Sequence, residues 1–219
     1  MSETDANSLD ILVILDRSGS MQQARSDHEE GLRSFVKEQR KLPGEVKFTL
    51  VQFDSGDPCE VVYDRAALAD VKPISLLPRG STPLLDAIGM ALAHLVEKQT
   101  TASTEQTVVL IITDGQENAS KEWTKAKVAA RIADLERQQW KFIFLGANVD
   151  AFAEARDLGI RARLTLDYSN TPAGVGHTYA AVSDNMISAR TLRSKGATLA
   201  VASAGYDFSD EQRKQAVDN

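Results

Sequence analysis

Cysteine is nearly absent from this sequence: Cys59 is the single one in 219 residues, so no internal disulfide can form. The N-terminal residues MSETDANS are polar and acidic, without the basic and then apolar segments of a signal peptide. No apolar run approaches the ~20 residues that a membrane span requires. We therefore expect a cytoplasmic protein with no membrane contact. Residues 1–8 are expected to form a disordered tail before the folded domain.

Basic residues are also in deficit, with 25 Lys and Arg against 31 Asp and Glu and a net charge of −6. Proteins that bind a phosphate backbone usually carry a basic excess, so no nucleic-acid partner is expected. The sequence lacks a G-x-x-x-x-G-K-[ST] phosphate loop, which disfavours nucleotide hydrolysis. The three histidines, His28, His94 and His177, fall on separate predicted helices, where a catalytic or ligand role is not expected.

Short apolar runs alternate along the chain with segments of helical periodicity. Strands are predicted at residues 9–15, 46–53, 59–63, 108–112, 142–145 and 162–166. Helices are predicted at residues 26–42, 84–96, 122–138, 151–158 and 173–193. This alternation predicts an α/β fold: a three-layer α/β/α sandwich with a doubly wound, mostly parallel sheet and one antiparallel edge strand.

The predicted domain covers residues 9–195, and residues 196–219 form a C-terminal extension or tail. The pattern fades after residue 196. The first part, GATLAVASAGY, fits an extra strand or an ordered arm, and FSDEQRKQAVDN reads as a polar tail. Trp123 and Trp140 are expected to pack helices against the sheet.

Two of the strongest predicted strands end in a carboxylate, at Asp16 and at Asp114. In an open parallel sheet, ligands bind at the carboxyl ends of the strands, where the winding reverses. Ser18 and Ser20 follow at alternate positions, so in an extended loop their hydroxyls lie on the same side as Asp16. Thr82, just before a strong predicted helix, offers another hydroxyl. Oxygen donors without His or Cys suit a hard cation such as Mg²⁺.

These motifs, D-x-S-x-S, then G-x-T-P-L, then T-D-G, resemble the von Willebrand factor type A family, whose fold is Rossmann-like. Their order and spacing are similar to that family's metal-ion-dependent adhesion site (MIDAS). The resemblance implies the metal ligands Asp16, Ser18, Ser20, Thr82 and Asp114. It further implies Mg²⁺ or Mn²⁺ with an incomplete coordination shell, completed by an Asp or Glu of a protein partner. The resemblance thus implies a stand-alone interaction module and no enzyme.

Each motif alone also has a local explanation. Asp16 can end a strand before a Ser-Gly-Ser turn, and Asp114-Gly115 is a common turn pair. Thr82 can cap a helix whose first residue is Pro83. Asp16 could instead be a phosphoryl-transfer nucleophile, but the second carboxylate of such sites is replaced by Ser18. The three motifs in order favour a metal site.

Two other functions stay open within the resemblance. One is service as an accessory subunit of a separate ATPase, in a chelatase-like or chaperone-like assembly. The other is metal-dependent hydrolysis, which needs a general base near the metal-bound water. Of the neighbouring acids, Asp54 is expected in a hairpin turn, and Asp86 is a candidate to hydrogen-bond a ligand or its water.

Overall fold

The computed structural model describes residues 8–99 and 106–218, so residues 1–7 of the predicted tail lie outside the described residues. Its strands form one six-stranded sheet in the order β3-β2-β1-β4-β5-β6. The strands are β1 (Leu9–Asp16), β2 (Val46–Asp54), β3 (Asp57–Ala67), β4 (Gln106–Thr113), β5 (Lys141–Gly146) and β6 (Thr165–Asp167). Only the edge strand β3 runs antiparallel to its neighbour. The predicted three-layer fold with one antiparallel edge is confirmed.

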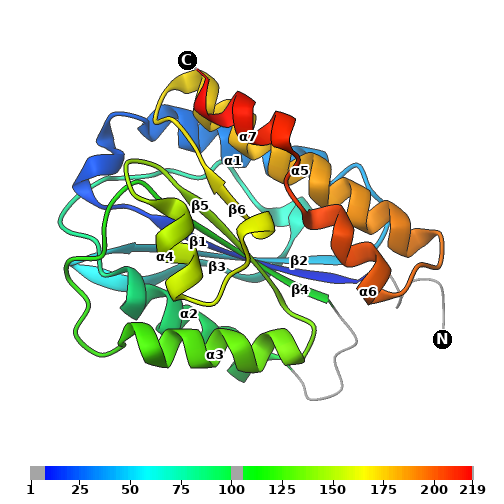
Figure 1. Ribbon diagram of the computed structural model, residues 1–219, viewed down its shortest axis with the longest axis horizontal. Coiled ribbons are helices and arrows are strands. Elements are labelled where there is room, and N and C mark those ends of the chain that lie inside the picture. Colours follow the sequence, from blue (N-terminus) through cyan, green and yellow to red (C-terminus); the bar gives the residue numbers. More distant parts are fainter. Residues whose placement is uncertain (1–7, 100–105, 219) are drawn as a thin grey trace.

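Helices connect the strands and cover both faces of the sheet. The α-helices are α1 (Arg25–Gln39), α2 (Leu84–Lys98), α3 (Lys125–Arg137), α4 (Ala151–Asp157), α5 (Pro172–Ser194), α6 (Leu199–Ala202) and α7 (Asp210–Val217). Short 3-10 turns are η2 (Gly19–Gln22), η3 (Leu68–Asp70), η4 (Ala162–Leu164) and η5 (Ser203–Tyr206). Figure 1 shows α1 and α5 on one side of the sheet and α2 and α3 on the other. Among the described residues, no helix combines the length and apolar character needed to cross a membrane.

The central strands are buried along their whole length because helices cover them on both sides. Every residue of β1 and of β4 is buried, which accounts for the apolar runs at residues 11–15 and 108–112 within them. β1 pairs in parallel with β2 on one side and with β4 on the other, with Leu15 opposite Ile112. The chain therefore reverses its winding between β1 and β4. The loops that follow both strands meet at this switch point.

The sixth strand is shorter than its sequence predicts. A strand is expected over residues 162–166, but Ala162–Leu164 is a 3-10 turn and β6 is only Thr165–Asp167. The turn leaves Arg163 exposed and buries Leu164. Alternating apolar and polar residues are compatible with a half-buried turn as well as with a strand. The strand prediction is therefore wrong for residues 162–164.

Residues 199–217 pack on the domain as short helices. Of the two alternatives for residues 196–206, the extra strand is therefore wrong and the segment is ordered. Tyr206 is fully buried and donates a hydrogen bond to Gln106 Oε1 (3.1 Å) at the start of β4. Gly205 lies against the backbone of α5: a Cβ there would come within 2.7 Å of the Ala189 nitrogen. α7 begins with a capping box formed by Ser209 and Gln212. The domain boundary at residue 195 stays a prediction.

The two tryptophans occupy different environments. Trp123 lies against α2, where a Cβ on Gly89 would meet its indole ring at 2.0 Å. The glycine is therefore required for this close approach. Trp140 is buried just before β5 and stacks on Phe142, with 6.4 Å between ring centroids. Trp123 thus packs on a helix, and Trp140 on a side chain of the sheet.

Candidate metal centre

The two acids predicted from the strand ends lie together at the switch point of the sheet. Asp16 ends β1, and Asp114 directly follows β4. Asp16 is fully buried, and its Oδ1 accepts a hydrogen bond from the Ser18 backbone N–H at 2.6 Å. Its Oδ2 accepts one from Thr113 Oγ1 at 2.7 Å. The side chain of Asp16 thereby fixes the start of the serine loop against the end of β4.

The three hydroxyls converge on one point above Gly115. A Cβ placed on Gly115 would lie 3.0 Å from Thr82 Oγ1, 3.3 Å from Ser20 Oγ and 3.8 Å from Ser18 Oγ. Ser20 Oγ also lies 3.0 Å from Ser18 Oγ and donates to Asp114 Oδ1 at 2.5 Å. Glycine leaves this point free of any side chain. Residues from three separate loops therefore form a small cradle of oxygen atoms.

Thr82 does not cap α2, so the helix-capping alternative from the sequence is wrong. The N-cap position is occupied by Pro83, and no side chain of the cap residue accepts a hydrogen bond. Instead Glu117 Oε2 accepts from the Leu85 N–H at 2.9 Å and replaces the missing cap. The Thr82 backbone is held by Asn118, whose Oδ1 accepts from Thr82 N–H at 2.9 Å and whose N–H donates to Thr82 O at 3.1 Å. The Thr82 hydroxyl is left for the cradle.

Burial makes the negative charge of this site costly. Removal from water raises the pKa of Asp16 to about 6, against the opposing hydrogen bonds from Thr113 and Ser18. Burial also raises the pKa of Asp114 above its usual range, again against its hydrogen bonds. Among the described residues, neither carboxylate forms an ion pair with a Lys or Arg. The neighbouring Arg17 turns away and pairs with Asp54 at 2.6 Å.

The donor set fits a hard divalent cation. Two carboxylates and three hydroxyls are all oxygen donors, the ligand type that Mg²⁺ and Mn²⁺ prefer. Within the described part of the chain, no group of three or more His, Cys, Asp and Glu side chains could hold a metal. Of the predicted ligands, only Ser20 is exposed, and the others are at most 2% exposed. Ser20 therefore marks a side on which the cradle is open to solvent.

Three contacts of this site were not predicted from the sequence. Asn170, just before α5, donates from Nδ2 to Asp114 Oδ2 at 3.0 Å. Asn118 holds Thr82, and Thr113 holds Asp16, as described above. Thr113 stands in the T-D-G motif and could have been found there. Asn118 and Asn170 lie in loops whose sequences carry no recognisable motif, and they reach the site only through the fold.

The other acids weighed from the sequence have structural partners. Asp54 lies at the β2–β3 hairpin and is fully buried, and its carboxylate accepts from Arg17 Nε at 2.8 Å and Arg79 Nε at 3.0 Å. Asp86 accepts the backbone N–H groups of residues 121–123 at 2.7–2.9 Å. Its carboxylate therefore holds the loop before α3, and its hydrogen bonds go to that loop.

The histidines have their contacts elsewhere. His28 is buried between Tyr179 and Tyr168, with Nδ1 3.2 Å from the first hydroxyl and Nε2 3.4 Å from the second. His94 Nε2 lies 3.0 Å from Asp64 Oδ1, and His177 Nδ1 lies 2.8 Å from the Gln215 carbonyl oxygen. None of these hydrogen bonds reaches a predicted metal ligand.

Comparison with known proteins gives one family and several similar folds. Residues 11–116 match the family model for the von Willebrand factor type A domain. Proximal thread matrix protein 1 from the mussel byssus, solved with a zinc-occupied MIDAS motif, is 18% identical over 81% of this chain and 47% of that chain, with a TM-score of 0.60. The pilus adhesin SpaC from Lactobacillus rhamnosus GG is 13% identical over 83% and 31%, with a TM-score of 0.66. None of the curated proteins matches the sequence.

A further solved structure of this kind is the manganese-loaded TRAP protein of Plasmodium vivax. It is 12% identical over 75% of this chain and 69% of that chain, with a TM-score of 0.50. The chain spans about half the length of the mussel proteins it matches. At these identities the structures show a shared fold, and the family match adds the sequence motifs from β1 to β4. Residues 11–116 are therefore similar in sequence to the von Willebrand factor type A domain, and the chain shares the fold of these structures.

Proposed function

We propose that this chain is a metal-dependent protein-interaction module. Asp16, Ser18, Ser20, Thr82 and Asp114 would hold Mg²⁺ or Mn²⁺, and an Asp or Glu of a protein partner would complete the site. The observation that carries this proposal is the cradle above Gly115, where three hydroxyls converge beside Asp114.

The electrostatics of the site support a cation. Two buried carboxylates without a Lys or Arg partner are an unfavourable arrangement at neutral pH, and a divalent cation between them removes the penalty. When bound, the cation supplies positive charge and a free coordination position, which attract an external carboxylate. The exposed Ser20 marks the side from which that carboxylate would enter.

The similar structures add independent support. The mussel protein has been solved with zinc in its MIDAS motif, and the Plasmodium protein has been solved loaded with manganese. SpaC is a pilus adhesin. For this chain, oxygen-only donors favour Mg²⁺ or Mn²⁺ over zinc, which prefers nitrogen and sulfur ligands.

Binding is favoured over hydrolysis because no general base stands beside the cradle among the residues that the structure describes. The hydrogen bonds of the three histidines lie elsewhere, as described above. Both carboxylates accept hydrogen bonds within the site itself. We therefore propose that the chain is not an enzyme. Manganese-dependent turnover of p-nitrophenyl phosphate that Asp114→Ala abolishes would contradict this part of the proposal.

The open coordination position is tested with Mn²⁺ as the probe. Water-proton relaxation measures the water that exchanges on protein-bound Mn²⁺. A short peptide that contains one Glu should lower this relaxation, because its carboxylate replaces bound water, while the Gln counterpart should not. Asp114→Ala serves as the control that loses the bound Mn²⁺. Equal relaxation with the Glu and Gln peptides would refute carboxylate capture.

A further inference from the structure

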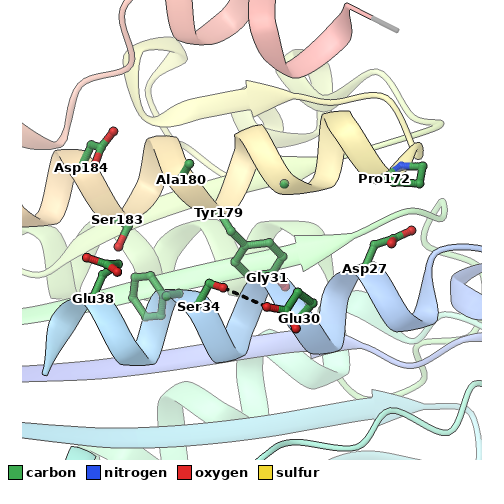
Figure 2. A pocket seen from close by; sticks show the side chains of 12 residues that line it. Asp27, Glu30, Gly31, Ser34, Glu38, Pro172, Tyr179, Ala180, Ser183 and Asp184 are labelled. Carbon is green, nitrogen blue, oxygen red and sulfur yellow. Dashed lines mark hydrogen bonds between the residues drawn. The ribbon is translucent and has the colours of Figure 1, made fainter.

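A second surface feature lies away from the metal centre, in a groove between α1 and α5 (Figure 2). Its volume is about 390 Å³, within the range of ~300–1,000 Å³ that is typical of ligand pockets. The lining residues are Asp27, Glu30, Gly31, Ser34, Phe35, Glu38, Pro172, Gly176, Tyr179, Ala180, Ser183 and Asp184. None of the predicted metal ligands is among them.

The floor of the groove is apolar and requires a glycine. Phe35 and Tyr179 are buried beneath it. A Cβ on Gly31 would come within 2.2 Å of the Tyr179 ring, so only glycine lets the two helices approach so closely here. At Gly176, by contrast, a Cβ would meet nothing within 4 Å. The groove therefore has open space above an apolar base on its α5 side.

The rim of the groove is acidic without a balancing positive charge in its lining. Four carboxylates line it and no Lys or Arg does. Glu30 and Glu38 pair on the surface with Arg33 and Lys41 of the same segment. No ion pair of Asp27 or Asp184 is found among the described residues. Figure 2 shows these two acids towards opposite ends of the groove, one on each helix.

We propose that this groove binds a basic segment of a protein partner, in which Lys or Arg residues flank an apolar side chain. The apolar side chain would rest over Phe35 and Tyr179, and the positive charges would pair with Asp27 and Asp184. Charge complementarity selects this occupant, because an acidic segment would meet four carboxylates. This binding does not need the metal, so the groove is an interaction surface separate from the function proposed above.

The test uses three labelled peptides of equal length, measured by fluorescence anisotropy in EDTA so that the metal centre plays no part. The first carries Lys and Leu at helical spacing, the second Lys and Ser, and the third Glu and Leu. We expect only the Lys–Leu peptide to bind. Tight binding of the Lys–Ser or the Glu–Leu peptide, or no binding of the Lys–Leu peptide, would overturn the proposal.

Two variants locate the binding on the protein. Gly176→Phe fills the groove without changing its charge, and Asp27→Asn with Asp184→Asn removes charge without filling it. Each should lower the affinity for the Lys–Leu peptide by about tenfold, which corresponds to ~1.4 kcal/mol of binding free energy. Asp70→Asn with Glu97→Gln changes the net charge equally at exposed acids outside the groove and should leave binding unchanged.

Three results from these variants would also overturn the proposal. Unchanged affinity in Gly176→Phe would mean that the peptide lies elsewhere. If the Asp27/Asp184 variant and the Asp70/Glu97 variant weaken binding equally, the peptide responds only to the overall charge of the protein. A dimer in sedimentation that Gly176→Phe dissolves would show that a second copy of this chain occupies the groove. Circular dichroism checks that each variant is folded. If Gly176→Phe does not fold, the variant Asp27→Asn with Asp184→Asn still tests the proposal.

Discussion

Gly115→Ala is predicted to block the metal centre without unfolding the protein. The new Cβ would lie 3.0 Å from Thr82 Oγ1 and 3.3 Å from Ser20 Oγ, in the space between the donors. Gly115 is not among the glycines with positive φ, so alanine fits its backbone. Reduced freedom of the unfolded chain stabilises such a variant by about 0.4–1 kcal/mol, which offsets the tight contacts.

The size of the effect follows from ligand linkage. At ~100 times its dissociation constant, a metal that binds only the native state adds about 2.7 kcal/mol to the free energy of unfolding. For a domain of this size, 1 kcal/mol moves the melting temperature by roughly 2–4 °C. Mn²⁺ should therefore raise the melting temperature of the natural sequence by roughly 5–11 °C. In Gly115→Ala this rise should vanish, while the melting temperature in EDTA stays nearly the same.

Thermal unfolding in EDTA, Mg²⁺, Mn²⁺ and Ca²⁺ measures both the melting temperature without metal and its rise when metal binds. Gly176→Ala is the matched control, because a Cβ there meets nothing within 4 Å and the position lies on α5. This control should be slightly more stable in every condition and keep the full metal-dependent rise. The reasoning is refuted if Gly115→Ala keeps the rise in melting temperature at the same metal concentration.

Three further predictions concern other contacts. Asn170→Ala removes the donor to Asp114 Oδ2 and should weaken Mn²⁺ binding by about tenfold in calorimetry; an unchanged affinity would contradict it. Burial lowers the pKa of His28 to about 4, so the unfolded state binds the extra proton between pH ~6.5 and ~4. The contribution of His28 to the free energy of unfolding should therefore fall by about 3 kcal/mol as the pH drops through this window, while the raised pKa of Asp16 acts in the opposite direction in both proteins. His28→Gln should remove that fall in urea denaturation with EDTA, and parallel curves for the two proteins would refute the assignment. Glu117→Ala removes the side chain that caps α2 at Leu85 and should cost about 1 kcal/mol in the same assay; no loss would show that the cap is dispensable.

The sheet was predictable because its central strands have no alternative. The apolar sequences of β1 and β4 are too short for a membrane span and have no polar face, so they must be buried on both sides. The C-terminal segment had no such signal. Its helices bury Tyr206 only because Gly205 lets the chain lie against Ala189 of α5. The hydrogen bond from Tyr206 to Gln106 spans 100 residues, and such a contact leaves no periodicity in the local sequence.

The candidate site was predictable to the extent that its donors stand in short motifs at strand ends. The strand order then brought these donors together: Ser20 donates to Asp114, and Asp16 accepts from Thr113, the neighbour of Asp114. The local rule for Thr82 failed, because a Thr-Pro pair suits a helix start while Glu117 from another loop caps α2. The N-terminus of α2 is thus capped by a side chain from a loop distant in the sequence, which a local rule cannot predict.

Metal ligation by the five predicted residues is the central claim, and anomalous diffraction from a crystal soaked in Mn²⁺ tests it most directly. We predict one strong anomalous peak in the cradle above Gly115, next to the hydroxyls of Ser18, Ser20 and Thr82, and none in a Gly115→Ala crystal treated in the same way. No peak in the natural protein, or a peak only at other side chains, would contradict the claim.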